Sequence, residues 1–291
     1  MNMDFKSAKE LLELCEQTQL PISEVMRQRE CILGETPRDA VDHRMGKAWE
    51  IMRSSATQPL KKPIKSMGGL IGGEARKLEA HYNKKKSICG DVLEKAMTYA
   101  MAVLEVNASM GLIVAAPTAG SAGVVPGMML ALQECYRISD QRIVDALFNA
   151  GAVGYLAMRN ATVAGAVGGC QAEIGIASAM AASAAVELMG GTPGQCLDAA
   201  STVLMNMLGL VCDPVGGLVE YPCQNRNAAG VANALIAAEI SLSGIRQLIP
   251  FDQMLDAMYA VGKRLPAELR ETALGGCATT PAACAACGLC S

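Results

Sequence analysis

Near its middle the chain reads Ala161-Thr-Val-Ala-Gly-Ala-Val-Gly-Gly-Cys170-Gln-Ala-Glu-Ile-Gly-Ile-Ala-Ser-Ala-Met180-Ala-Ala-Ser-Ala-Ala-Val-Glu-Leu-Met189. This run consists almost entirely of Ala, Gly, Ile and Met, and its side chains are smaller than those that strands favour. Ala and Met are among the strongest helix formers, and a helix that is apolar on all sides belongs in a core. The stretch therefore predicts a buried helix.

The composition of the whole chain extends this prediction. Of the 291 residues, 51% are hydrophobic but only 3% are aromatic, which argues against a β-sandwich or barrel. No dinucleotide-binding Gly-x-Gly-x-x-Gly motif follows a strand-like run. We expect an all-α protein, with buried Ala/Gly-rich helices and functional Gly-rich loops between them. Hydrophobic spacing predicts helices at about residues 7–17, 91–105, 127–137, 140–160, 195–209, 227–243 and 251–264.

The charge pattern excludes two classes of partner. A formal net charge of −3 does not suit a general nucleic-acid binder, which needs a basic surface. The apolar stretches at 101–116 and 161–188 are interrupted by Glu105, Asn107 and Glu173, and charges are costly inside a membrane-spanning helix. The N-terminus has no basic segment followed by an apolar one, so no secretory signal is expected. We therefore expect a cytoplasmic protein that binds neither membranes nor nucleic acids.

Cysteines are numerous, with twelve in the chain. In a reducing compartment such residues are read as metal ligands, catalytic groups or small buried hydrophobes. We expect the last of these for Cys15 and Cys196, which lie in helix-like stretches, and a similar place for Cys31, Cys89 and Cys135.

Three other cysteines lie beside Gly or Pro, where the backbone leaves regular structure. They are Cys170, Cys212 and Cys223, separated by 42 and 11 residues. Three thiolates suit a [4Fe–4S] cluster with one iron left open, and an open iron can act as a Lewis acid. The spacing alone leaves both the cluster and the small-hydrophobe interpretation open.

Six longer motifs resemble the alpha chain of the iron–sulfur-dependent L-serine dehydratase (L-serine ammonia-lyase) family, over about residues 60 to 276. They are Ser66-Met-Gly-Gly-Leu-Ile-Gly-Gly-Glu74, Ala116-Pro-Thr-Ala-Gly-Ser-Ala-Gly123, Gly165-Ala-Val-Gly-Gly-Cys-Gln-Ala-Glu173, Met207-Leu-Gly-Leu-Val-Cys-Asp-Pro-Val215, Val219-Glu-Tyr-Pro-Cys-Gln-Asn-Arg-Asn227 and Leu265-Pro-Ala-Glu-Leu-Arg-Glu-Thr-Ala-Leu-Gly-Gly276.

The resemblance implies that Cys170, Cys212 and Cys223 bind a [4Fe–4S] cluster. In this interpretation its open iron acts on the serine hydroxyl while a base removes the α-proton, and aminoacrylate then hydrolyses to pyruvate and ammonia. The resemblance also implies a helical catalytic chain that pairs with a separate beta chain in a hetero-oligomer, with a role in amino-acid catabolism and gluconeogenesis. Three parts are expected: a helical N-terminal layer at 1–60, a catalytic iron–sulfur domain at 61–276 and a Cys-rich tail at 277–291.

Under this resemblance the small-residue loops gain a role in substrate binding, because such loops offer hydroxyls and N–H groups to a carboxylate. The candidates are Ser66, Gly68, Gly69, Thr118, Gly120, Ser121, Asp213 and Asn227, with Arg226 either a carboxylate clamp or a surface charge.

The sequence does not identify which residue is the catalytic base. The chain has two histidines, His43 and His81, and His81 is the better candidate because it follows the Gly-rich loop. The beta chain is the alternative source of the base.

The tail reads Cys284-Ala-Ala-Cys-Gly-Leu-Cys290, preceded by Cys277. In some serine dehydratases of this type a cysteine near the C-terminus caps the open iron, and Cys290 is the candidate here. A disordered tail with reactive thiols is the alternative.

Three other functions compete with the serine lyase. One is a related lyase acting on cysteine or threonine. Another is a pyridoxal-phosphate dehydratase in which Lys65 beside the Gly-rich loop forms the Schiff base. The third is a non-enzymatic zinc or iron–sulfur module.

Overall fold

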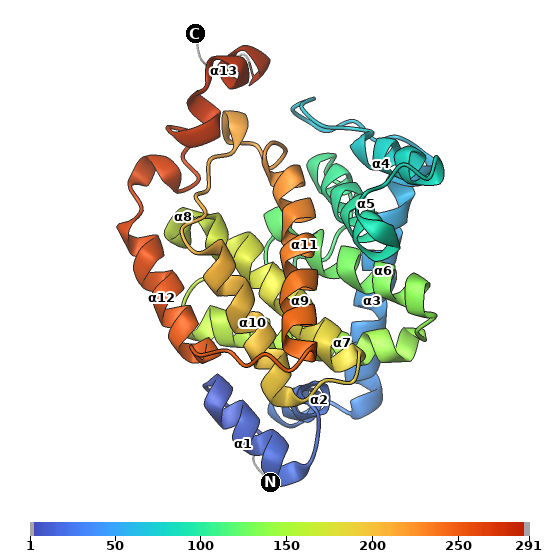
Figure 1. Ribbon diagram of the computed structural model, residues 1–291, viewed down its shortest axis with the longest axis vertical. Coiled ribbons are helices and arrows are strands. Elements are labelled where there is room, and N and C mark those ends of the chain that lie inside the picture. Colours follow the sequence, from blue (N-terminus) through green and yellow to red (C-terminus); the bar gives the residue numbers. More distant parts are fainter. Residues whose placement is uncertain (1–2, 288–291) are drawn as a thin grey trace.

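The computed structural model describes residues 3–287, and this part of the chain forms helices joined by loops, with one isolated bridge between Cys212 and Arg270 and no strand (Figure 1). The all-α prediction is confirmed. The helices are α1 (Ala8–Thr18), α2 (Ile22–Leu33), α3 (Arg38–Lys61), α4 (Glu74–Asn83), α5 (Gly90–Ala108), α6 (Val124–Tyr136), α7 (Asp140–Asn160), α8 (Gly165–Gly168), α9 (Ile176–Leu188), α10 (Pro193–Met207), α11 (Cys223–Leu242), α12 (Phe251–Arg264) and α13 (Pro281–Cys287).

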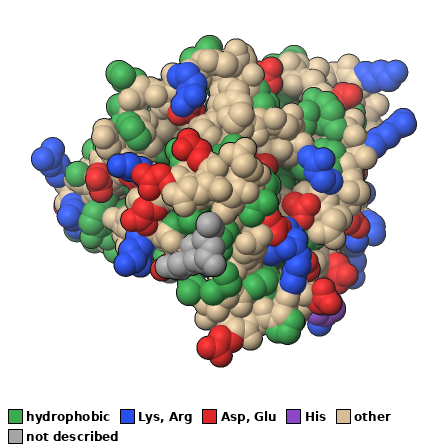
Figure 2. Space-filling model, turned by 90° about the horizontal axis from the view of Figure 1, so that it is seen from below, with side chains coloured by type: hydrophobic (Ala, Val, Ile, Leu, Met, Phe, Trp, Pro, Cys, Tyr) green, Lys and Arg blue, Asp and Glu red, His purple; other side chains and the backbone are tan. Residues whose placement is uncertain are grey.

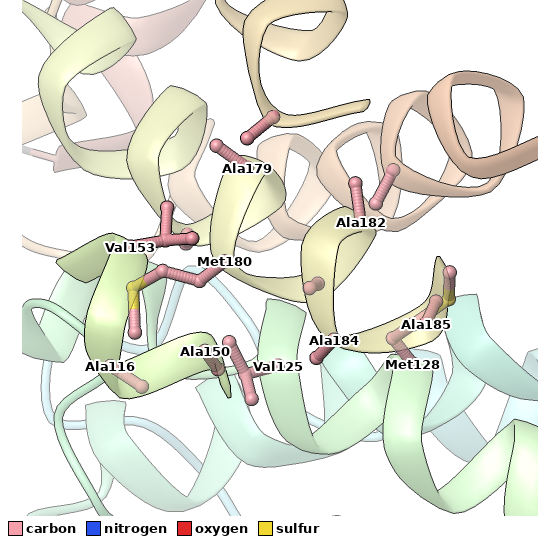
Figure 3. Close-up of a cluster of buried hydrophobic side chains, with 14 of the residues drawn as sticks. Ala116, Val125, Met128, Ala150, Val153, Ala179, Met180, Ala182, Ala184 and Ala185 are labelled. Atoms are coloured by element: carbon pink, nitrogen blue, oxygen red, sulfur yellow. The ribbon is translucent and has the colours of Figure 1, made fainter. Parts of the chain in front are cut away.

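Helix α9 forms the centre of the core. It packs against α6, α7, α10 and α11, and every residue from Ile176 to Val186 is buried. Figure 3 shows its alanines and Met180 among Val125 and Met128 of α6 and Val153 of α7. Small side chains on α9 let four helices approach it at once, which is why this stretch carries so few large residues.

The predicted central helix is interrupted before it reaches this core. Residues 161–189 form α8, a π-helical turn η2 (Gln171–Gly175) and α9 rather than one continuous helix. The break falls at Gly169, whose φ of +77° is left-handed and favours glycine. A Cβ at Gly169 would lie 2.7 Å from Leu265 Cδ1 and 2.8 Å from Leu210 O, so no other residue fits. The break places Cys170 at the end of the core.

The N-terminal helices lie at the opposite end of the molecule from α13 (Figure 1). The buried Arg27 of α2 joins them to the rest, because its guanidinium contacts Glu24, Asp42 of α3 and Asp145 of α7. It also lies 4.5 Å from the centre of the Phe148 ring. On the face shown in Figure 2, acidic and basic side chains are interspersed. The division of the chain at residues 60 and 276 stays a prediction.

The structure agrees with some of the predictions for the cysteines and the tail and differs from others. Cys15 and Cys196 are buried in the core, as expected, whereas Cys31, Cys89 and Cys135 are partly exposed. The tail forms a 3-10 turn η5 (Gly276–Thr279) followed by α13, although its sequence has no hydrophobic period. Cys290 lies outside the described residues. Within residues 3–287, no helix is both long enough and apolar enough to cross a membrane.

Two helical glycines provide a matched test of the close packing. A Cβ at Gly127 of α6 would lie 2.7 Å from Ala96 O and 2.9 Å from Ala100 N of α5, whereas a Cβ at Gly151 of α7 would meet nothing within 4 Å. We expect Gly127→Ala to lower the free energy of unfolding by about 1–3 kcal/mol through overpacking. Gly151→Ala should raise it by up to about 1 kcal/mol through helix propensity. Urea unfolding of both variants measures this, and equal effects would contradict the packing argument.

A second test uses the acid dependence of stability. Hydrogen bonds from Arg38, followed in size by burial and by bonds from Gln28 and Arg27, set the pKa of Glu24, and their net effect lowers it to about 2. Because this value lies below that of the unfolded chain, the Glu24 carboxylate stabilises the fold above about pH 4.5. That contribution decreases as the pH falls towards 2. We expect Glu24→Gln to be less stable than wild type at pH 7, with the difference in melting temperature narrowing between pH 5 and 3. A constant difference across this range would contradict the assignment.

Candidate active site

Three thiols from separate parts of the sequence meet at one end of the core. Cys170 precedes the π-helical turn η2, Cys212 lies in the segment after α10, and Cys223 begins α11. All three are buried, with exposed fractions of 2%, 3% and 8%. A hydrogen bond with Cys170, followed by burial, raises the pKa of Cys212 well above its usual range. Burial, followed by the charges of Cys170 and Glu173, raises the pKa of Cys223 to about 12.

Gln171 holds the first two cysteine segments together. Its backbone N–H donates to Leu210 O at 3.0 Å, and its side-chain oxygen accepts from Gly209 N at 2.8 Å. Its amide nitrogen donates to the carbonyls of Gly168 and Met258. One buried side-chain amide therefore bonds Gly168, Met258 and Gly209 and fixes the position of the chain leading to Cys212.

Arg226 joins the second and third cysteine segments. It lies one turn after Cys223, and its guanidinium pairs with Asp213 at 2.7 Å and donates to Val211 O at 3.0 Å. Asp213 also accepts from the backbone N–H of Cys277 at 2.6 Å. In this structure Arg226 and Asp213 therefore bind each other and fix the segments around Cys212, Cys223 and the tail.

The donor set fits the [4Fe–4S] cluster that the sequence resemblance implies. The high pKa values of Cys212 and Cys223 mean that thiolates at these buried positions require a nearby positive charge. Iron supplies that charge, and thiolate is the ligand that iron–sulfur clusters take. No three His, Cys, Asp or Glu side chains within residues 3–287 stand close enough together to hold a single metal ion. A cluster, in contrast, binds each thiolate through a different iron atom.

The Gly-rich loop at 66–72 already holds a carboxylate, and that carboxylate belongs to the chain itself. Glu220 accepts from Ser66 Oγ at 2.7 Å, from Gly68 N at 2.6 Å and from Leu70 N at 2.9 Å. Ser66 Oγ in turn accepts from the N–H of Gly69 and Ile71. The loop thus has the anion-binding donors expected from its sequence. In this structure those donors anchor the segment that leads to Cys223.

The second small-residue loop contains η1 (Ala119–Ser121) and lies beside the thiols. Thr118 Oγ1 donates to Glu173 Oε1 at 2.9 Å and lies 3.0 Å from Ser121 Oγ. Asn227 is fully buried, accepts from Gly123 N and donates to the carbonyls of Gly120 and Cys223. Asn227 therefore positions this loop against α11. The N–H of Gly120 makes no hydrogen bond within the described residues.

Glu173 is the site residue that sequence reasoning missed. It lies in the π-helical turn η2, three residues after Cys170, and such turns are frequent at functional sites. Its carboxylate accepts from Thr118 and lies 3.7 Å from Cys212 Sγ. Desolvation raises the pKa of Glu173 above its ordinary value, and the bond from Thr118 opposes this. The motif around Cys170 contained Glu173, but only the fold shows that it faces Cys212 and Thr118.

Other candidates lie apart from this group. His81 is exposed in the last turn of α4, and His43 is exposed on α3, with no contact between either side chain and the three cysteines in the described part of the chain. The assignment of the base to His81 stays a prediction. Lys65 is exposed, and the strand–helix alternation usual for a pyridoxal-phosphate site is absent from residues 3–287. Capping of an open iron by Cys290 stays a prediction as well.

Comparison with known proteins agrees with the motifs. Residues 17–278 match the family model described as serine dehydratase alpha chain. The chain belongs to this family. The match includes the predicted stretch at 60–276 and extends the likeness towards the N-terminus, through α2 and α3 to the end of α1.

Two relatives in the family share nearly their whole length with this chain. The probable L-serine dehydratase alpha chain of Bacillus subtilis is 47% identical over 277 residues, which cover 95% of this chain and 92% of that protein. The L-serine dehydratase alpha chain of Peptoniphilus asaccharolyticus is 44% identical over 272 residues, which cover 94% and 93%. The L-serine dehydratase of Helicobacter pylori strain 26695 is longer. It is 38% identical over 284 residues, which cover 62% of its length.

Glu220 provides a test of how the site is held together. Glu220→Ala removes the acceptor of three donors in the loop at 66–70 and leaves them unpaired, at a cost of about 3 kcal/mol in the free energy of unfolding. Hydrogen exchange at the amides of Gly68 and Leu70 should speed up most. Glu220→Gln keeps an acceptor oxygen, so its exchange rates should lie between those of wild type and those of Glu220→Ala. Glu239→Ala, at an exposed position of α11, is the control. Unchanged exchange at Gly68 in Glu220→Ala would contradict the anchoring role.

Proposed function

We propose that this chain is the catalytic chain of an L-serine dehydratase, which converts L-serine to pyruvate and ammonia. Family membership makes it an enzyme of the serine ammonia-lyase class, a carbon–nitrogen lyase. The observation that carries the proposal is the meeting of three buried thiols with a small-residue loop that has an available donor, the N–H of Gly120. Three buried thiols without a substrate-binding loop would equally suit a site for electron transfer or a purely structural metal site.

Cys170, Cys212 and Cys223 would hold the [4Fe–4S] cluster. When bound through three thiolates, such a cluster supplies an open iron as a Lewis acid for the serine hydroxyl, because hydroxide is a poor leaving group. The chain's own residues enclose this position. Gln171 fixes the turn at Cys170, and the pair of Arg226 and Asp213 fixes the segments of Cys212 and Cys223.

The loop at 116–123 would bind the substrate carboxylate. The N–H of Gly120 points to this role because it has no partner among residues 3–287, and the Thr118 and Ser121 hydroxyls lie beside it. Asn227 holds the loop in place through Gly123 and Gly120. The donors at Ser66, Gly68 and Gly69 are engaged within the chain, so their contribution to substrate binding would require Glu220 to give them up.

Removal of the α-proton needs a placed base, which typically contributes 10²–10⁴-fold in rate. His81 is the histidine that we propose for this step in the chain itself, and a residue of the beta chain is the alternative. We propose a separate beta chain as partner because the relatives of matching length are named alpha chains, whereas the relative from Helicobacter pylori is longer and named without a chain. The assembly would be a cytoplasmic hetero-oligomer.

Metal analysis of cysteine variants tests the proposal. The chain is purified anaerobically, with its beta chain, and iron, acid-labile sulfide, zinc and pyridoxal phosphate are measured. Wild type should hold about four iron and four sulfide per chain and form pyruvate from serine. Cys212→Ala should lose the cluster and lower serine turnover by about 10³-fold, in keeping with the loss of a Lewis acid worth several kcal/mol.

The matched control is Cys196→Ala, a buried cysteine of α10 outside the group of three thiols, which should keep both iron and turnover. Retention of iron and activity in Cys212→Ala would refute the assigned ligands. Zinc or pyridoxal phosphate in place of iron in wild type would refute the chemistry, and faster turnover of threonine or cysteine than of serine would refute the substrate.

A further inference from the structure

Glu173 is an acidic side chain without a cationic partner at the centre of the candidate active site. Its two hydrogen-bonding partners in the described structure are the Thr118 hydroxyl and the Cys212 thiol. The guanidinium of Arg226 is paired with Asp213. A carboxylate held in a largely desolvated position without a counter-ion is costly, and a ligand that brings a positive charge would remove that cost.

Two glycines lie against the Glu173 carboxylate. A Cβ at Gly165 would lie 2.6 Å from Glu173 Oε2 and 2.9 Å from Cys212 Sγ, so the Gly165 backbone packs directly against both and no side chain fits there. On the other side, a Cβ at Gly120 would lie 3.6 Å from Glu173 Oε1. Glu173 itself is partly exposed. Glycine backbone rather than larger side chains therefore lies on two sides of the carboxylate, and its exposed part is the part that a small ligand can reach.

The order of groups in this site matches the order of groups in an amino acid with a hydroxyl on its β-carbon. Glu173 contacts Cys212 on the side of the thiols and Thr118 on the side of the loop, and a Cβ at Gly120 would lie 3.6 Å from its Oε1. A serine molecule bound with its hydroxyl towards the thiols and its carboxylate towards Gly120 has its α-ammonium group between the two. We infer that Glu173 binds the α-ammonium group of the substrate and so selects amino acids over hydroxy acids.

This inference rests on the proposed serine dehydratase function and adds the group that recognises the amine. Glu173→Gln is the decisive variant, because glutamine keeps the size of the side chain and an acceptor for Thr118 while removing the charge. Glu271→Gln is the control: Glu271 is exposed, and its charge acts on Glu173 without a hydrogen bond between them.

The readout is equilibrium binding, separate from turnover. L-alanine and propanoate differ in the ammonium group, and neither carries a leaving group, so their dissociation constants are measured by calorimetry on the anaerobic holoenzyme. Wild type and Glu271→Gln should prefer L-alanine. Glu173→Gln should lose roughly 10- to 100-fold in affinity for L-alanine, as expected for a hydrogen bond between charged groups, with propanoate binding unchanged. The KM for serine should rise in parallel, with iron content equal to that of wild type.

Three results would overturn the inference. They are an unchanged preference for L-alanine in Glu173→Gln, an equal loss for both ligands, and a fall in kcat alone with KM and L-alanine affinity unchanged, which would indicate a proton-transfer role. If Glu173→Gln does not load its cluster, Glu173→Asp replaces it. This variant keeps the charge but retracts it by one carbon, and it should reduce the preference several-fold. An unchanged preference in Glu173→Asp also refutes the inference. Failure of the proposed function would show differently, as wild type without iron or serine turnover.

Discussion

Helix α9 has no exposed residue between Ile176 and Val186, and four helices pack around it. Because α9 offers small side chains on every side, each neighbour lies close to it, and its own position along the axis is fixed by packing rather than by a few polar contacts. The π-helical turn η2 leads directly into α9, so packing around α9 also fixes the position of η2. Cys170 and Glu173 lie in or beside that turn, so these two side chains are attached directly to the helix around which the core packs.

The fold was largely predictable from the sequence, because local propensity and burial act together in this chain. Helices α5, α7, α10 and α12 begin and end within a few residues of the positions that hydrophobic spacing predicts. The interruption at Gly169 was not predicted, because it depends on the approach of Leu265 and Leu210, which are distant in sequence. The helix α13 was missed for a related reason: it packs against η3 (Val215–Gly217) and η5, so tertiary contacts compensate for its weak hydrophobic pattern.

The candidate site was likewise predictable from the sequence only in part. The residue types at Cys170, Cys212 and Cys223, each beside Gly or Pro, marked the cysteine group in the sequence, and the fold brings these thiols together. What the residue types did not indicate is which polar side chains are already engaged. Ser66 and Asn227 are typical substrate-binding residues by type, yet here they satisfy Glu220 and the backbone of the loop at 120–123. Hydrogen-bond partners of this kind are set by the three-dimensional path of the chain, which a motif does not contain.

Each small-residue loop is held by a glutamate from a cysteine-bearing segment: Glu220 for the loop at 66–72 and Glu173 for the loop at 116–123. Glu220 lies three residues before Cys223. Between them, the carbonyl of Tyr221 accepts a hydrogen bond from the N–H of Val215. The position of the Ser66 loop and the position of the Cys223 thiol are therefore connected through one short stretch of backbone. Thermodynamic coupling is reciprocal, so a ligand that reorders the loop changes the affinity of the cysteine site by the same factor by which occupancy of the cysteine site changes the affinity for that ligand.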